Sequence, residues 1–274
     1  MSKIDKQKEM SVIQKEGIVY YQFKSLKPYE EKLVHAFVGK PSDFRITQQG
    51  EDKELEKNYR KILTLLDLKP QNLIRPLQSH TDCVEIVDNQ IEKEYFYGYN
   101  FENVDGMITN KIGLVLATIE SDCTPILLYD PVQNVLANIH SGWRGTVQKI
   151  GQKAAIKMIE KFGCHPKDIL CCMGPTIHPC HFEVEEEVKE IFKNTFSYLG
   201  NTNLWLKTGR IENGVQKYNI NIPMIQTALM KEIGVPEENI ENSNICTVCE
   251  VEHFHSYRKE GKQTGRNCLI CALK

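Results

Sequence analysis

One cysteine and one histidine flank two apolar runs in a way that would let them share a metal ion. Cys123 precedes the run 126–129, and His140 follows the run 135–139. The segment DPVQN between the runs has the composition of a turn, so the two runs predict a β-hairpin. A hairpin places residues just before its first strand beside those just after its second strand. We therefore expect the thiol and the imidazole at the same end of the hairpin.

The register of this hairpin decides how close the two side chains come. With the turn centred on the DPVQN segment, Tyr129 lies opposite Val135. Continuing that pairing places Cys123 opposite Ser141, the neighbour of His140. Directly opposed residues have Cβ atoms about 4.5–5.5 Å apart, a separation at which a thiolate and an imidazole can bind one ion.

A third ligand would make the pair a useful metal site. His80 lies in the polar segment LQSHTD, just before a predicted strand, and is the best candidate. One cysteine and two histidines suit zinc, and three protein ligands leave a fourth position for water or substrate, as in catalytic sites. The alternative is that His80 and His140 are ordinary polar residues at strand ends and Cys123 is a buried thiol.

The segment HSGWRGT follows the second strand and begins a predicted helix. Gly142 and Gly145 permit tight backbone turns there, and free N–H groups at a helix start favour anions. Arg144 would add a bidentate grip on phosphate or carboxylate. The alternative is a structural strand-to-helix turn that carries a surface arginine.

Several periodic segments would form the framework that positions these residues. The hairpin argues against a purely parallel sheet, so we expect an α/β fold of the α+β type. The expected architecture is a single-domain mixed β-sheet sandwich with flanking helices over residues 1–274, with 1–15 a frayed N-terminal extension. The pattern predicts helices over 53–68, 145–163, 185–196 and 218–235, and strands near 84–87 and over 112–119, 168–173 and 267–274.

Composition excludes several classes of protein. The formal net charge is −2, so no basic face indicates binding to nucleic acid or to an anionic membrane. No apolar run approaches the roughly 20 residues of a membrane helix, and the charged N-terminus lacks a signal-peptide core. We therefore expect a cytoplasmic protein whose ten cysteines are mostly buried thiols. The oligomeric state stays open.

Four motifs together resemble the YfiH family, the bacterial laccase-domain or polyphenol-oxidase-type proteins. They are SDCTPILLYDP, IHSGWRGT, MGPTIHPCHFEV and HSYRKEGKQTGR, and the resemblance extends from about Leu73 to the C-terminus. The resemblance implies a YfiH-like fold and a bound Zn²⁺. Its matching ligand positions are His80, Cys123 and His140.

The resemblance also implies activity on purine nucleosides. It suggests phosphorolysis of adenosine, inosine, guanosine and methylthioadenosine with inorganic phosphate as co-substrate, and hydrolytic deamination of adenosine. A metal ion that activates water suits attack on C6 of adenine. The residues then expected to be catalytic are Cys123, Asp122 and Arg144, and those expected to bind substrate are Arg144, Gly142, Gly145 and Arg266. Two of these assignments have alternatives. Asp122 would instead cap a turn, and Arg266 would instead face solvent.

The sequence departs from the family near its N-terminus. Family members carry an arginine soon after the strand that corresponds to HAFVGKPSDF, whereas this chain has no arginine before Arg45. Lys40 is the candidate substitute, but lysine does not reproduce a planar bidentate contact. Phe254 and His255 stand where a pair of aromatic residues is usual. These changes leave substrate choice open.

Other cysteines raise the alternative of a structural zinc site. They follow C-x2-C-x18-C-x2-C, a four-thiolate spacing, at Cys246, Cys249, Cys268 and Cys271. Residues three apart on a strand point to opposite faces, so the second pair, inside the predicted strand 267–274, would chelate one ion poorly. The segment HPCH at 178–181 predicts a turn before a helix or, less favourably, metal ligands.

Three further functions compete with the zinc enzyme. A copper-dependent polyphenol oxidase needs many histidines, and this chain has eight, although a Cys/His₂ site would bind Cu²⁺ in vitro. A metal-free cysteine hydrolase or deamidase would use Cys123 as nucleophile and His140 as base, which leaves His80 without a role. A non-enzymatic binding module would explain none of these residues.

Overall fold

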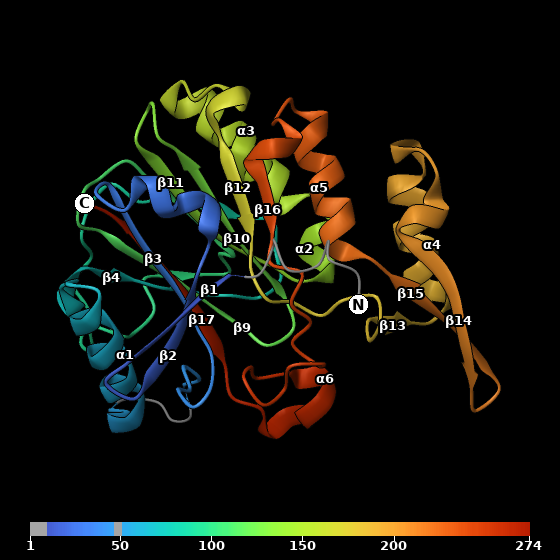
Figure 1. Cartoon of the computed structure of the whole chain (residues 1–274), viewed down its shortest axis with the longest axis horizontal. Coiled ribbons are helices and arrows are strands. Elements are labelled where there is room, and N and C mark those ends of the chain that lie inside the picture. Colours follow the sequence, from blue (N-terminus) through green and yellow to red (C-terminus); the bar gives the residue numbers. More distant parts are fainter. Residues whose placement is uncertain (1–9, 47–50) are drawn as a thin grey trace.

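Two six-stranded sheets form the centre of the protein in this computed structural model, which describes residues 10–46 and 51–274. Figure 1 shows the arrangement. The first sheet has the order β1-β2-β3-β17-β9-β4, with bounds Ser11–Lys15, Ile18–Gln22, Leu33–Val38, Asn267–Leu273, Val115–Glu120 and Leu73–Ile74. The second has the order β16-β12-β10-β11-β8-β6, with bounds Ile240–Asn242, Leu170–Met173, Thr124–Asp130, Val135–Ser141, Gly106–Thr109 and Val84–Ile86.

Smaller sheets and helices surround these two sheets. A three-stranded sheet has the order β13-β15-β14, with bounds Glu183–Val184, Val215–Ile220 and Leu206–Glu212. Strands β5 (Pro76–Leu77) and β7 (Phe101–Glu102) pair separately. The α-helices are α1 to α6, with bounds Lys53–Leu65, Trp143–Val147, Ile150–Phe162, Glu186–Phe196, Ile222–Glu232 and Tyr257–Glu260.

The main hydrophobic core lies between the two large sheets. In β10, Leu127 and Tyr129 face the other sheet, whereas Ile126 and Leu128 face the opposite way, toward the helices. This alternation follows from the two-residue repeat of a strand. Because the central strands are covered on both faces, they are apolar at nearly every position.

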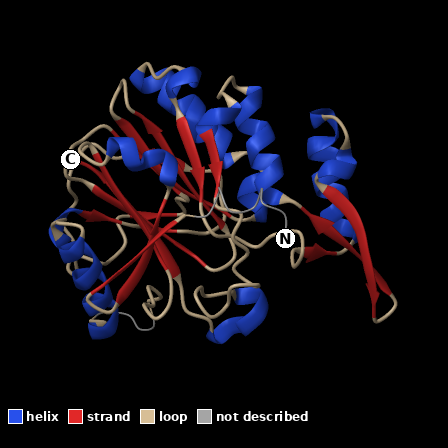
Figure 2. Ribbon diagram, in the orientation of Figure 1, coloured by secondary structure: helices blue, strands red, loops and turns tan. Residues whose placement is uncertain are grey.

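Helices cover the outer face of each large sheet. Leu55 and Tyr59 of α1 pack on the first sheet, and Ala154 and Met158 of α3 pack on the second. Helix α4 and the three-stranded sheet form a separate hydrophobic cluster with α5. In Figure 2, α4 and the three-stranded sheet extend to the right of the two large sheets. The sequence prediction of a mixed α/β sandwich with flanking helices is confirmed.

Three local predictions need correction. The hairpin is present, but Val135 pairs with Asp130 rather than with the predicted Tyr129. The turn between the strands holds four residues, 131–134. The predicted helix 145–163 is two helices, α2 and α3, because Lys149 between them has a φ of 62°. Residues 11–15, expected to be frayed, form the edge strand β1, while residues 1–9 lie outside the described residues.

The other predicted elements match with shifted ends. Helix α1 stops at Leu65, and the start of the predicted helix 218–235 is the end of β15. Gly163 caps α3 with a φ of 69°, as its position after the last helical residue suggested. Within residues 10–46 and 51–274, none of the helices is both long enough and apolar enough to cross a bilayer.

Candidate metal centre

Three side chains from separate segments converge at one end of the hairpin. His80 lies in the loop between β5 and β6, Cys123 in the turn between β9 and β10, and His140 in β11. Their ligand atoms all lie within 4.8 Å of one another, and the Cys123 Sγ is 3.8 Å from the His80 Nε2. His80 is exposed, Cys123 half-buried and His140 buried, so the group is open to solvent on one side. The three ligands proposed from the sequence therefore lie together.

Backbone conformation and a glycine allow this convergence. The hairpin register pairs Pro125 with His140, which leaves Cys123 just beyond the ladder rather than opposite Ser141. A Cβ atom on Gly142 would lie 2.7 Å from the His80 Cδ2 and 3.1 Å from the Cys123 Sγ. Only glycine fits at that position without displacing two of the three ligand candidates.

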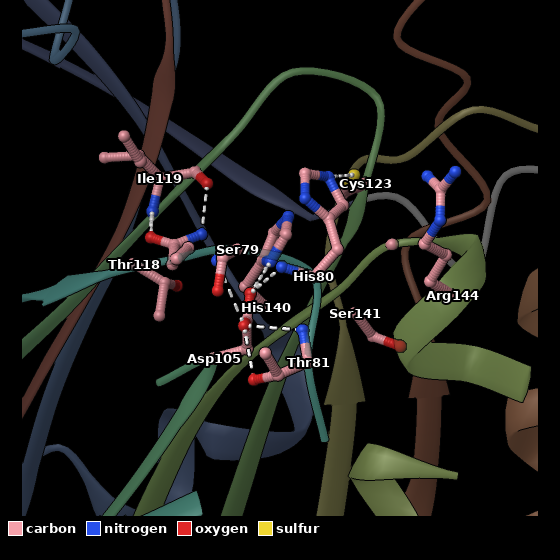
Figure 3. Close-up of polar contacts among 12 residues, drawn as sticks. Ser79, His80, Thr81, Asp105, Thr118, Ile119, Cys123, His140, Ser141 and Arg144 are labelled. Carbon is pink, nitrogen blue, oxygen red and sulfur yellow. Dashed lines mark hydrogen bonds and ion pairs between the residues drawn. The ribbon is translucent and has the colours of Figure 1, made fainter. Parts of the chain in front are cut away.

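A buried carboxylate, Asp105, orients both histidines. Its Oδ1 is 2.7 Å from the Nδ1 of His140 and accepts a hydrogen bond from the backbone N–H of His80 (Figure 3). Its Oδ2 accepts from the N–H of Ser79 and from both the N–H and the hydroxyl of Thr81. Engaging Nδ1 of His140 leaves its Nε2 for an ion, the arrangement typical of metal-binding histidines.

The charges of the group favour a cation. Burial would lower the pKa of His140, but the Cys123 thiolate, the hydrogen bond to Asp105 and the charge of Glu120 raise it to about 10. Burial would raise the pKa of Cys123, but His140 and His80 lower it to about 6. Burial would raise the pKa of Asp105, but the hydrogen bonds with His140 and Thr81 lower it to about 2. A buried thiolate and carboxylate thus surround one imidazole.

Glu120 is a buried acid that sequence analysis missed. Its side chain is 1% exposed, and neither carboxylate oxygen is hydrogen-bonded to a described residue. Burial raises its pKa to about 8. It lies at the end of an apolar strand, where nothing in the local pattern distinguishes a buried carboxyl from an exposed one.

A cavity of about 510 Å³ opens above the three ligand candidates. Its walls include the rings of Trp143, Phe182 and Tyr257, and the side chains of Ile177 and Ile222. Pockets of roughly 300–1,000 Å³ with apolar walls and few polar groups typically bind small organic molecules. The cavity therefore has the size and lining of a small-molecule site.

Arginines approach this cavity from the C-terminal segment. Arg258 and Arg266 line it, whereas Arg144 is not among its lining residues. Arg144 is exposed and its guanidinium stacks 4.3 Å from the ring of its neighbour Trp143. Lys40, the candidate substitute for the family arginine, pairs with Glu260 at 2.7 Å and is also absent from the lining.

The remaining candidates have structural contacts. Gly142 lines the cavity, and a Cβ atom on Gly145 would lie 3.2 Å from the Ile150 side chain and 3.3 Å from the Thr81 carbonyl oxygen. Asp122 also lines the cavity, but each of its carboxylate oxygens accepts a hydrogen bond from another segment. The Thr247 hydroxyl donates to Oδ1 and the Arg258 N–H to Oδ2, both at 2.6 Å. These contacts favour a role in holding the surrounding loops.

The four-thiolate alternative is not formed. Cys268 and Cys271 are fully buried in β17, one facing the outer layer and the other the layer between the sheets. They are therefore separated from each other by the sheet, as the strand geometry predicted. Cys246 and Cys249 instead lie beside Cys180 and His181 of the HPCH turn.

We expect Asp105→Asn to weaken metal binding by roughly 10–100-fold, the usual effect of changing a residue that orients a ligand histidine. Asparagine keeps the shape but removes the charge that fixes His140. Competition with a chromophoric chelator would measure the zinc affinity. Asp82→Asn is the matched control, since Asp82 pairs with Lys153 rather than with a histidine. Equal affinity of Asp105→Asn and wild type would contradict this role.

Comparison with known proteins gives matches over most of the chain. The sequence profile of the family described as "Multi-copper polyphenol oxidoreductase laccase" matches residues 42–274. A purine nucleoside phosphorylase from Bacteroides thetaiotaomicron is 30% identical over 238 residues, 83% of this chain and 84% of that protein. An adenosine deaminase from an unknown prokaryotic organism is 32% identical over 202 residues, 71% of this chain and 72% of that protein.

A solved structure shares the fold. The crystal structure of the hypothetical protein YfiH from Bacillus licheniformis superposes with a TM-score of 0.83 at 24% identity, covering 93% of this chain and 96% of that one. The fold and the resemblance inferred from the sequence motifs are thereby confirmed. The chain belongs to the multi-copper polyphenol oxidoreductase laccase family, and its fold is similar to that of YfiH.

Proposed function

We propose that this protein is a zinc-dependent enzyme acting on purine nucleosides. The proposed reactions are phosphorolysis of adenosine, inosine, guanosine and methylthioadenosine, and hydrolytic deamination of adenosine. The observation that carries the proposal is the open group of His80, Cys123 and His140 beneath a cavity of nucleoside size. Relatives named purine nucleoside phosphorylase and adenosine deaminase support the choice of substrate.

The residues fit a zinc ion. One thiolate and two imidazoles, within 4.8 Å of one another, form a donor set that zinc prefers, and Asp105 already holds His140 with Nε2 free. The exposed side at His80 provides room for a fourth ligand. When bound, zinc supplies Lewis-acid chemistry at that open position. The single-cysteine, two-histidine set would also bind copper, which the family name suggests.

The cavity walls suggest how a nucleoside would be held. A purine is flat and apolar on its faces, so the rings of Trp143, Phe182 and Tyr257 offer stacking surfaces. Phosphorolysis joins a phosphate oxygen to C1′ of the ribose as the bond from C1′ to the base breaks, which releases the free purine. Arg258 and Arg266, which line the cavity, would hold the phosphate for this step.

A metal-free cysteine hydrolase is the second candidate, and one observation favours it. The Asp105 carboxylate contacts the His140 imidazole, and His140 lowers the pKa of Cys123, so the three would serve as the orienting carboxylate, the base and the nucleophile of a catalytic triad. His80, only 3.8 Å from the thiol, has no function in such a triad. This arrangement would act without any metal and would be indifferent to chelators.

Product analysis tests the proposed reactions directly. With adenosine, we expect adenine only when phosphate is present, and inosine when phosphate is absent. Cys123→Ala should reduce turnover by more than the roughly 100-fold effect of residues that merely orient ligands, because it removes a ligand itself. Cys83→Ala is the control, because Cys83 is half-buried and is not one of the candidate metal ligands. No turnover of any purine nucleoside by wild type would exclude the proposal.

The arginines can be separated by their phosphate dependence. Arg266→Ala should raise the KM for phosphate by roughly 10–100-fold, because a hydrogen bond to a charged group contributes about 1.5–3 kcal/mol. Arg144→Ala should leave it nearly unchanged, since that side chain is exposed and outside the cavity lining. The steady-state rate against phosphate concentration measures both. A larger effect from Arg144→Ala would return the phosphate site to the position first predicted from the sequence.

A further inference from the structure

A second group of metal-ligand candidates lies outside the site described above. Cys180 and His181 come from the turn before β13, and Cys246 and Cys249 come from the turns after β16. Their ligand atoms all lie within 4.8 Å of one another. Residues more than sixty positions apart in the chain thus bring three thiols and one imidazole together.

The separations match the edges of a tetrahedron around zinc. The Cys180 Sγ is 3.6 Å from the Cys246 Sγ and 3.8 Å from the Cys249 Sγ. The Nδ1 of His181 is 3.2, 3.7 and 3.6 Å from the sulfurs of Cys180, Cys246 and Cys249. Zn–S bonds of about 2.3 Å and Zn–N bonds of about 2.0–2.1 Å give tetrahedral edges of about 3.8 Å between sulfurs and about 3.5 Å between sulfur and nitrogen.

Neither core packing nor disulfide formation explains this group. All ten cysteines lie in the described ranges, and Cys180 and Cys249 are the two that are exposed. Both exposed thiols therefore belong to this group, where they lie beside the Cys246 thiol and the His181 imidazole. A disulfide needs sulfurs about 2.05 Å apart and would leave one of the three thiols unpaired. All three are free.

We propose that Cys180, His181, Cys246 and Cys249 bind a structural Zn²⁺ ion in a Cys₃His site. Four protein ligands fill the coordination of zinc and leave no position for substrate, which is the property of a structural site. This ion is separate from the one proposed at His80, Cys123 and His140, and the two sites share no ligand.

The position of this Cys₃His site shows what the ion would stabilise. Its two ligand-bearing segments meet through a β-bridge between Thr176 and Cys246. Thr247, next to Cys246, donates to Asp122, which is next to Cys123. The carbonyl oxygen of His181 accepts a hydrogen bond from Arg258 at 2.5 Å. The ion would therefore fix the wall of the cavity.

The side chains lining that wall flank the ligands. Ile177 and Phe182 lie on either side of the 178–181 turn and both face the cavity. Loss of the ion should loosen these side chains without removing a ligand of the first metal site. Because metal binding contributes directly to folding stability at such sites, removing the ion should also lower the melting temperature.

Metal content of matched variants tests the inference without relying on activity. Wild type, Cys249→Ala, Cys123→Ala and the control Cys83→Ala are purified with zinc and analysed by elemental mass spectrometry. We expect Cys249→Ala and Cys123→Ala each to carry one ion fewer per chain than wild type, and Cys83→Ala to match wild type. Cys249 is exposed, so its truncation opens no cavity in the core.

Cobalt substitution identifies the ligands. Cys123→Ala, which retains the Cys₃His site, should give the intense sulfur-to-cobalt charge-transfer band of several thiolates. Cys249→Ala should lose most of that intensity. Zinc content and cobalt spectrum unchanged by Cys249→Ala would overturn the proposal, as would a disulfide among the three cysteines in freshly purified protein. These outcomes do not depend on nucleoside turnover, so failure here leaves the proposed function untouched.

Discussion

The buried carboxylate of Asp105 is the contact on which the candidate site depends. It accepts hydrogen bonds from three consecutive residues, Ser79, His80 and Thr81, and it contacts the ring of His140. The backbone carbonyl oxygen of Asp105 also accepts a hydrogen bond from the backbone N–H of His140. One residue directly before β8 therefore fixes a loop and a strand that carry two of the three ligand candidates. Because the carboxylate is fully buried, each of these bonds acts in a medium of low dielectric constant.

The same arrangement explains why a cation is favoured at this place. Burial would lower the pKa of the His140 imidazole, but the Cys123 thiolate and the hydrogen bond to Asp105 raise it to about 10. Without a metal, a proton on His140 balances part of this charge. A divalent ion bound between His80, Cys123 and His140 would balance more of it, at the floor of a cavity lined by aromatic and aliphatic residues together with two arginines. Charge and shape thus favour the same use of the site.

The sequence predicted the parts of the site that depend on local pattern. Two apolar runs around a turn are enough to place Cys123 and His140 at one end of a hairpin, although the predicted register is wrong by one residue because the predicted turn, 130–134, is one residue longer than the observed turn, 131–134. His80 was found from its position before a strand. Asp105 was missed because its four partners come from segments that the tertiary fold brings together.

Long-range contacts also decide the surroundings of the other candidate residues. Arg144 follows the ligand strand directly, yet it is exposed at the start of α2 and is not among the residues that line the cavity, whereas Arg266, also proposed from the sequence, lines it together with Arg258. Spacing along the chain offers Cys268 and Cys271 as partners of Cys246 and Cys249, an alternative that strand geometry already disfavours. The structure gives them Cys180 and His181, because the β-bridge between Thr176 and Cys246 joins those segments.

Zinc reconstitution of the wild-type protein shows whether nucleoside turnover depends on a metal ion. The metal is removed with a chelator, and nucleoside turnover is followed as zinc is added back. We expect turnover to disappear with the metal and to return in proportion to the zinc that binds. Full turnover by the metal-free protein, abolished by alkylation of Cys123, would contradict this expectation and would identify a cysteine hydrolase.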